Sequence, residues 1–192
     1  MRKVLLSTHV TLDGFMAGPN SELDWHFANW NDEMEKHVND QRSDFDTILV
    51  GRVTYEGMAK HWTALAADPT APKKDVDFAK WMNELPKVVF SKTLQTLEWN
   101  NSRQVKENIT EEISRLKREP GKDMIMWGGV GIVSTFIQLG LIDEYQIWVA
   151  PVVLGKGKPL FSNVKKGFDL ELIKSKKFSN GVLLNNYRPK PQ

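Results

Sequence analysis

Short apolar segments alternate with helical patterns along most of this chain, and this order restricts its fold more than any other feature. The apolar segments predict buried strands at residues 3–11, 47–50, 87–90 and 124–127. After residue 144 the pattern changes to strands alone, at 144–153, 170–178 and 182–187, with a turn signal at Asn180-Gly181. Alternating units favour parallel pairing and consecutive strands favour antiparallel pairing. The chain therefore predicts an α/β fold with a mixed sheet, helices on both faces and an antiparallel C-terminal edge.

Helical patterns occupy the intervals between the predicted strands. They lie at residues 31–43, 54–60, 77–84 and 130–139, and a further helix is expected to begin with Thr110 as its N-cap and to end at Pro120. The stretch 64–75 contains two prolines and predicts a surface loop. Neither a repeat nor a low-complexity segment interrupts this order, so we expect one domain over residues 1–192.

Composition narrows the class of protein. The 192 residues include no cysteine, which excludes disulfides and thiol nucleophiles, and the 4 histidines lack the spacing of a metal site. A net charge of +2 gives no field that would favour nucleic acid. No apolar run approaches the roughly 20 residues that span a bilayer, and residues 4–10 lack the pattern of a signal peptide. We expect a cytoplasmic protein with no metal, membrane or nucleic-acid partner.

Three strand ends carry residues suited to phosphate binding. Gly51 allows close backbone approach, Arg52 offers a planar guanidinium, and Thr54 can cap the helix that follows. Ser91, Lys92 and Thr93 place two hydroxyls around a cation after the next strand. Ligands of open α/β sheets bind beyond the carboxyl ends of the strands, so these segments should converge. Each segment alone also fits an ordinary turn with a surface cation.

The third strand end is rich in glycine. Three glycines lie in the segment Trp127-Gly128-Gly129-Val130-Gly131-Ile132, between a strand and a helix. Such glycines let a pyrophosphate or a nicotinamide lie against the backbone at the positive end of the helix. The segment nearly matches the dinucleotide fingerprint, but it comes late in the chain without the usual βαβ unit and acidic residue after it. A standard Rossmann domain is therefore disfavoured.

Together these segments resemble the dihydrofolate reductase superfamily. The motifs are Thr11-Leu12-Asp13-Gly14-Phe15, Gly51-Arg52-x-Thr54-Tyr55-Glu56, Ser91-x-Thr93, Gly128-Gly129 and Pro151-Val152-Val153-Leu154-Gly155-x-Gly157-x-Pro159-Leu160-Phe161. The chain is most similar to the branch related to the C-terminal reductase domain of the bifunctional riboflavin-biosynthesis deaminase-reductase. The resemblance implies a dihydrofolate reductase-like three-layer fold, NADPH as cofactor and a homodimer.

The resemblance also implies which residues hold the cofactor. It assigns the adenosine phosphates to Gly51, Arg52, Thr54, Ser91, Lys92 and Thr93, and the nicotinamide cover to Thr11, Asp13 and Gly14. The glycine-rich segment, with Gly128, Gly129, Val130, Gly131 and Ile132, would lie under the cofactor, and in the family the glycine pair often has an unusual peptide geometry. The substrate candidates are Leu154, Gly155 and the aromatic side chains Trp25, Phe27 and Trp30, which could stack a flat substrate or equally cover the core.

The expected activity is NADPH-dependent reduction of a small heterocyclic or ribosyl substrate, most like 5-amino-6-(5-phosphoribosylamino)uracil. The deaminase motif is absent, since the chain has no cysteine. Asp24 is the candidate proton donor, although it does not sit in a copy of the folate motif and could equally be a surface carboxylate. Alternatives left open are a pteridine reductase of the dihydrofolate reductase type, a non-catalytic NADPH-binding protein, and an interaction protein on a reductase scaffold.

Overall fold

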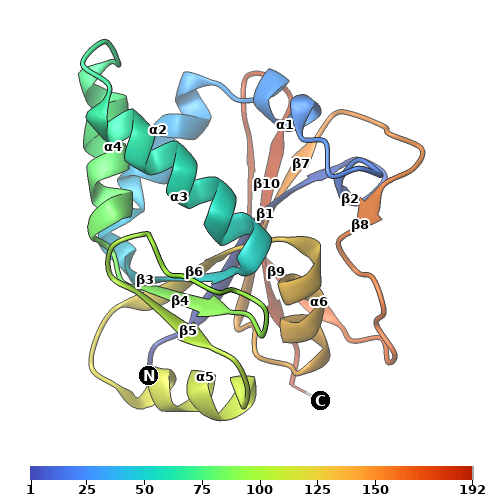
Figure 1. Ribbon diagram of the computed structural model, residues 1–192. Helices are drawn as coiled ribbons and strands as arrows, with labels where there is room; N and C mark the ends of the chain where they lie inside the picture. The colour runs from blue at the N-terminus through green and yellow to red at the C-terminus, as the bar shows by residue number, and fades with distance from the viewer. Residues whose placement is uncertain (192) are drawn as a thin grey trace.

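An eight-stranded sheet runs through the centre of the computed structural model, which describes residues 1–191 (Figure 1). Its strand order is β5-β4-β3-β6-β1-β7-β10-β9. The first six strands in this order pair in parallel, whereas β10 and β9 pair antiparallel. The predicted mixed sheet with an antiparallel C-terminal edge is confirmed. The strands are β1 (Val4–Thr11), β3 (Phe45–Gly51), β4 (Lys87–Phe90), β5 (Ser102–Val105), β6 (Asp123–Trp127), β7 (Glu144–Ala150), β9 (Leu170–Lys177) and β10 (Leu183–Pro189).

Helices cover both faces of this sheet. On one face lie α2 (Asp32–Asp40), α3 (Arg52–Ala67) and α4 (Lys73–Glu84), and on the other lie α5 (Ile109–Arg118) and α6 (Val130–Gln138) (Figure 1). Alternation along β1 explains the two layers, because Leu6 packs on the α5–α6 side and Leu5 on the α3–α4 side. The molecule thus has the three layers that the sequence predicts.

Several helix boundaries differ from the sequence-based expectation, most of all those of α3, α4 and α5. The N-cap of α5 is Asn108, in the left-handed region at φ 55°, and Thr110 lies inside the helix. Asparagine tolerates this conformation far better than a β-branched residue does. The expected loop at 64–75 shrinks to 68–72, because the leucine and alanines before Asp68 extend α3 and Pro72 starts α4.

A small second sheet closes one side of the molecule. It pairs β2 (Phe15–Ala17) with β8 (Lys158–Pro159), and the short helix α1 (Asp24–Ala28) follows β2. Gly157 is required here, since a Cβ on it would lie 2.3 Å from the carbonyl oxygen of Ala17. The pair brings the turn after β1 and the loop after β7 together beside the strand ends.

Candidate active site

The carboxyl ends of the parallel strands bring the three candidate segments to one edge of the sheet. Gly51 on β3 pairs with Phe90 on β4, and Leu49 pairs with Met126 on β6. Ser91 comes directly after Phe90, and Gly128 comes two residues after Met126, just as Gly51 comes two residues after Leu49. The three segments therefore end level with one another. This edge carries the start of α3, the turn after β4 and the start of α6.

Two helices begin side by side at this edge, and neither has a side-chain cap. Gly51 is the N-cap of α3 and Gly129 is the N-cap of α6. A Cβ on Gly129 would lie 3.1 Å from Thr54 Oγ1, and one on Gly51 would lie 3.0 Å from Ile132 Cγ2. The first turns contain no acidic residue. Free N–H groups of two helices thus point to a common place, which is the arrangement that favours an anion. Thr54 lies within the first turn of α3 and does not cap the helix.

The glycines of the third segment differ in what surrounds them. A Cβ on Gly128 would lie 2.1 Å from Val133 Cγ2, so this glycine is needed for packing. A Cβ on Gly131 would meet no other atom within 4 Å, and this glycine is exposed. The expected unusual peptide geometry is not found, because residues 1–191 contain no cis peptide bond and Gly129 is extended at φ −81° and ψ 149°.

The polar residues at the strand ends already have intramolecular partners. Arg52 is exposed and pairs with Glu56 at 3.0 Å, one helical turn along. The Ser91 hydroxyl accepts the backbone N–H groups of Thr93 and Leu94, at 3.1 and 3.0 Å. Ser91 therefore shapes the turn after β4. The exposed Arg52 guanidinium, in contrast, can bind an anion at the helix starts by giving up only its surface ion pair with Glu56.

Thr11 and Asp13 hold two loops together. The Asp13 carboxylate accepts the Thr11 hydroxyl at 2.6 Å and the backbone N–H groups of Leu154 and Gly155 at 3.1 and 2.8 Å. These bonds, that of Thr11 first, lower the pKa of Asp13. Gly14 supplies the turn at φ 83°. The predicted cofactor cover and the predicted substrate loop therefore lie side by side, joined by this carboxylate and by backbone hydrogen bonds such as Leu12 N to Val152 O at 2.8 Å.

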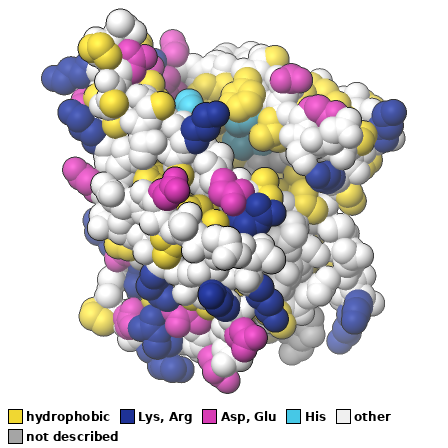
Figure 2. All heavy atoms as spheres, viewed as in Figure 1, with side chains coloured by type: hydrophobic (Ala, Val, Ile, Leu, Met, Phe, Trp, Pro, Cys, Tyr) yellow, Lys and Arg dark blue, Asp and Glu magenta, His cyan; other side chains and the backbone are white. Residues whose placement is uncertain are grey.

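Next to this edge the surface has a hollow lined with aromatic side chains. Figure 2 shows a histidine set back among hydrophobic side chains. The His9 ring on β1 lies 4.1 Å from the His26 ring on α1 and stacks on Trp148 of β7 at 5.2 Å between ring centroids. Trp30 lies 5.6 Å from His9. In the sequence, His9, His26 and Trp148 carry no pattern that predicts a role, whereas Trp30 is a candidate to stack a flat substrate or to cover the core. Of the predicted substrate-side residues, Trp25 is buried and Asp24 is exposed at the start of α1.

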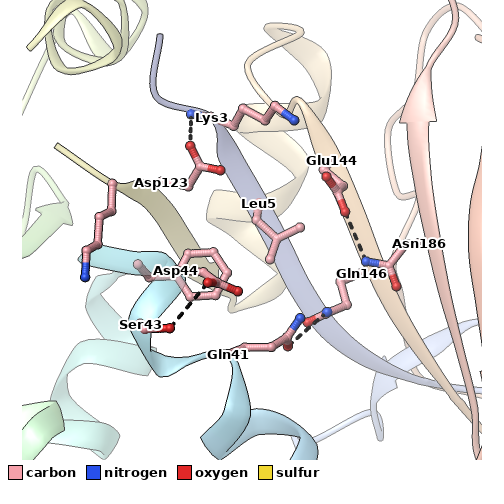
Figure 3. A pocket seen from close by; sticks show the side chains of 11 residues that line it. Lys3, Leu5, Gln41, Ser43, Asp44, Asp123, Glu144, Gln146 and Asn186 are labelled. Atoms are coloured by element: carbon pink, nitrogen blue, oxygen red, sulfur yellow. Dashed lines mark hydrogen bonds between the residues drawn. The ribbon is translucent and has the colours of Figure 1, made fainter. Parts of the chain in front are cut away.

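A second hollow lies at the opposite edge of the sheet and does not belong to this site. It has a volume of about 440 Å³ and is lined by polar residues such as Gln41, Asp123 and Glu144 (Figure 3). It faces the amino ends of the strands, where open α/β sheets rarely bind ligands. Within residues 1–191 no three histidine or acidic side chains are grouped to hold a metal ion. In the same part of the chain, no helix has the length and apolar character to cross a membrane.

The fold and the position of the site define the class: a dihydrofolate reductase-like α/β protein. Dihydrofolate reductase from Enterococcus faecalis, solved in complex with NADP(H), covers 98% of this chain and 97% of its own with a TM-score of 0.62 at 11% identity, a likeness of fold alone. Within this class the chain belongs to the RibD C-terminal domain family, which matches residues 2–184. The family confirms the resemblance carried by the sequence motifs.

Several relatives span nearly the whole chain. The uncharacterized protein YyaP of Bacillus subtilis is 36% identical over 182 residues, 95% of this chain and 92% of its own length. YwjB of the same organism is 32% identical and covers 97% of this chain and 98% of its own. A putative riboflavin biosynthesis protein from a Shewanella species superposes over both full chains with a TM-score of 0.76 at 22% identity.

A relative in sequence also has a name that states this pathway. The riboflavin biosynthesis protein RibD of Corynebacterium ammoniagenes is 25% identical over 166 residues, which are 80% of this chain. The match covers 44% of that protein, so this chain spans less than half of it.

Proposed function

We propose that this protein is an NADPH-dependent reductase of a small heterocyclic or ribosyl substrate, most like 5-amino-6-(5-phosphoribosylamino)uracil. Membership of the RibD C-terminal domain family and the likeness to RibD support the reaction class. The proposal includes a cytoplasmic, homodimeric protein of one domain.

The observation that carries the proposal is the meeting of two uncapped helix starts at the carboxyl edge of the sheet. The N-termini of α3 and α6 are preceded by Gly51 and Gly129, and neither first turn has a carboxylate. A diphosphate carries the negative charge that these N–H groups favour. The residues therefore fit the phosphates of a dinucleotide.

The remaining residues of the edge would position that cofactor. Arg52 at the start of α3 can pair with the 2′-phosphate that distinguishes NADPH from NADH. Gly131 leaves open space above α6. When bound, NADPH would supply the hydride. The loops that Asp13 joins would shield the transfer from water, a role suited to their place beside β1.

Titration of both cofactors into Arg52→Ala tests the proposal. Charge-assisted hydrogen bonds contribute roughly 1.5–3 kcal/mol each, so NADPH binding should weaken by about tenfold to a hundredfold. NADH binding should change little, because it lacks the 2′-phosphate. Arg115→Ala is the control, since Arg115 is also an exposed helical arginine that pairs with a glutamate one turn along, Glu119, but it lies on α5. Equal losses for both cofactors would place Arg52 on the pyrophosphate, and no loss would remove it from the site.

Turnover assays separate the alternatives. NADPH oxidation with the ribosylaminopyrimidine supports the proposed reaction, whereas oxidation with dihydrofolate supports a pteridine reductase. We expect little dihydrofolate turnover, because Asp24, the candidate proton donor, is exposed at the start of α1. Binding of NADPH without oxidation by either substrate would favour a non-catalytic NADPH-binding protein.

A further inference from the structure

The aromatic hollow contains two histidines that the cofactor site does not use. His9 projects from β1 on the face covered by α1, α2 and α3, opposite to Leu6 and Val10. His26 projects from α1 and meets it, with 4.1 Å between the ring centroids. The two residues are 17 positions apart in sequence, so only the packing of α1 on the sheet brings them together.

Aromatic rings surround the two histidines. His9 stacks on Trp148, and Trp30 lies 5.8 Å from His26. Phe27 lies 5.0 Å from His26, and both Phe27 and Trp30 are exposed, at 69% and 36%. Exposed aromatic side chains beside a recessed polar pair are typical of a site that stacks a flat ligand.

Polar atoms in this region lack partners. Within the described residues, His26 Nδ1 and Trp25 Nε1 are buried without a hydrogen bond. Burial, and for His9 also the charge of its neighbour, holds the pKa of each histidine below its usual value, so the pair stays neutral near pH 7. A neutral imidazole has one donor and one acceptor nitrogen.

The hollow lies within reach of the proposed cofactor. β1 is separated from β3 by β6 alone, and neighbouring strands lie about 4.8 Å apart, which places His9 roughly 10 Å across the sheet from the start of α3. A dinucleotide with its phosphates at α3 and α6 could direct its other end toward β1.

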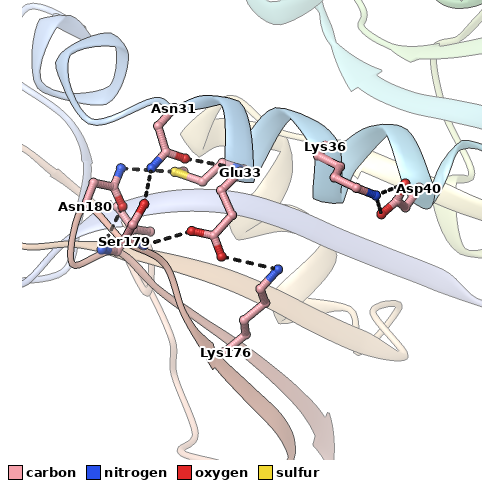
Figure 4. A network of polar contacts seen from close by, with 9 residues as sticks. Asn31, Glu33, Lys36, Asp40, Lys176, Ser179 and Asn180 are labelled. Carbon is pink, nitrogen blue, oxygen red and sulfur yellow. Dashed lines mark hydrogen bonds and ion pairs between the residues drawn. The ribbon is translucent and has the colours of Figure 1, made fainter.

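A network of polar contacts fixes the segment that carries His26. Asn180, in the turn between β9 and β10, donates to the carbonyl of Asn29 at 2.6 Å, and Ser179 N donates to Glu33 at 2.9 Å (Figure 4). Asn31 Oδ1 caps α2 by accepting from Met34 N at 3.0 Å. The chain on both sides of Trp30 is thus anchored, which fixes this wall of the hollow.

We propose that His9 and His26 determine the specificity of this site by hydrogen-bonding the lactam edge of the heterocycle, while Trp30 and Phe27 stack on its face. A lactam edge presents a carbonyl acceptor beside an N–H donor, which a neutral imidazole pair complements. This inference rests on the proposed function for the reaction and assigns the residues that select the heterocycle.

Calorimetric titration of lumazine, a flat lactam heterocycle, into the protein saturated with NADP+ tests the proposal. His26→Phe and His9→Phe keep a ring but remove its nitrogens, and each should weaken lumazine binding roughly three- to tenfold. His26→Gln restores an amide donor and acceptor and should bind within about twofold of the wild type. His61→Phe is the control, because His61 is an exposed histidine on α3 that packs on Trp62.

The outcomes are distinguishable. NADP+ affinity and far-UV circular dichroism should be unchanged in the variants, which shows that the fold and the cofactor site are intact. No lumazine binding by the wild type, or wild-type affinity in both phenylalanine variants, would overturn the proposal. If NADP+ fails to bind while lumazine still depends on the histidines, the proposed function fails and this inference stands. If one variant unfolds, the other together with His26→Gln decides the result.

Discussion

At the scale of single residues, Gly131 is the most direct probe of the cofactor site. It lies in the first turn of α6 with no atom within 4 Å of an added Cβ, so Gly131→Ala should fold and gain about 0.5–1 kcal/mol of helix stability. The same methyl group would intrude on a diphosphate at the helix start. We expect NADPH binding to weaken at least tenfold, measured by fluorescence titration alongside thermal unfolding.

The matched control is Gly57→Ala. Gly57 is also an exposed helical glycine with open space around it, but it lies further along α3. It should gain similar stability and bind NADPH normally. Normal binding by Gly131→Ala as well would mean that the cofactor does not pass over the start of α6. Gly128→Ala is the poorer probe, because its methyl group would meet Val133 and disturb the core.

Lys87 gives the protein a measurable pH dependence of stability. Its side chain is fully buried, donates to the carbonyls of Asn83 and Asn100 and packs over the Trp99 ring at 4.3 Å. Burial lowers its pKa from 10.5 to about 8. The folded protein therefore loses this proton before the unfolded chain does, and the desolvation cost present below pH 8 is relieved as the pH rises toward 10.5.

The comparison that isolates this effect is with Lys87→Met. Between pH 7 and pH 10 the free energy of unfolding of the wild type should rise by about 2–3 kcal/mol relative to the variant, as measured by urea unfolding. The difference between the two proteins is needed because burial raises the pKa of Tyr145, which lowers stability at alkaline pH in both. Parallel pH profiles would show that Lys87 titrates normally.

At the scale of elements, Asp13 links the turn after β1 to the loop after β7. Asp13→Ala removes the acceptor for the N–H groups of Leu154 and Gly155. We expect these two amides to exchange hydrogen faster in the variant, while those of β1 keep their protection, measured by hydrogen exchange and mass spectrometry. Because the pKa of Asp13 is lowered, the link should persist near neutral pH and loosen only as the carboxylate is protonated in acid. Unchanged exchange at the loop would show that β2 and β8 alone hold it.

The elements differ in how far the sequence predicts them. β3, β4 and β6 contain the apolar runs 48–50, 88–90 and 124–127, so their burial and parallel pairing follow from the pattern. β5, with the sequence Ser-Arg-Gln-Val, and α1, with five residues, carry no such period and form through contacts with the rest of the fold.

The same contrast applies to the site. The strand-end segments could be predicted because the topology of parallel sheets sends them to one edge. The hollow could not, because His9, His26 and Trp148 meet only through β1–β7 register and the packing of α1.

At the scale of the whole molecule, the expected dimer needs a surface that the monomer leaves free. In the sequence, the strand-rich segment 145–161 offers apolar side chains for this interface. Tyr145 and Trp148 are buried within the monomer, however, so chiefly Val153 and Phe161 remain exposed. A second exposed apolar surface lies on β9, the last strand of the sheet order. Leu172 and Ile173 on this strand are 53% and 50% exposed. An edge strand with exposed apolar residues is a ready surface for a second copy of the chain.

We expect a homodimer that depends on this edge. Light scattering coupled to size exclusion should give twice the chain mass of 22.0 kDa at micromolar concentration. The double variant Leu172→Glu and Ile173→Glu should shift the mass to that of the monomer, because carboxylates buried in an interface lose solvation without a partner. Leu97→Glu alters an exposed leucine outside the regular strands and should leave the dimer intact. A wild-type monomer would remove the dimer from the proposal, and a dimer unaffected by the double variant would place its interface elsewhere, with Val153 and Phe161 the next residues to substitute.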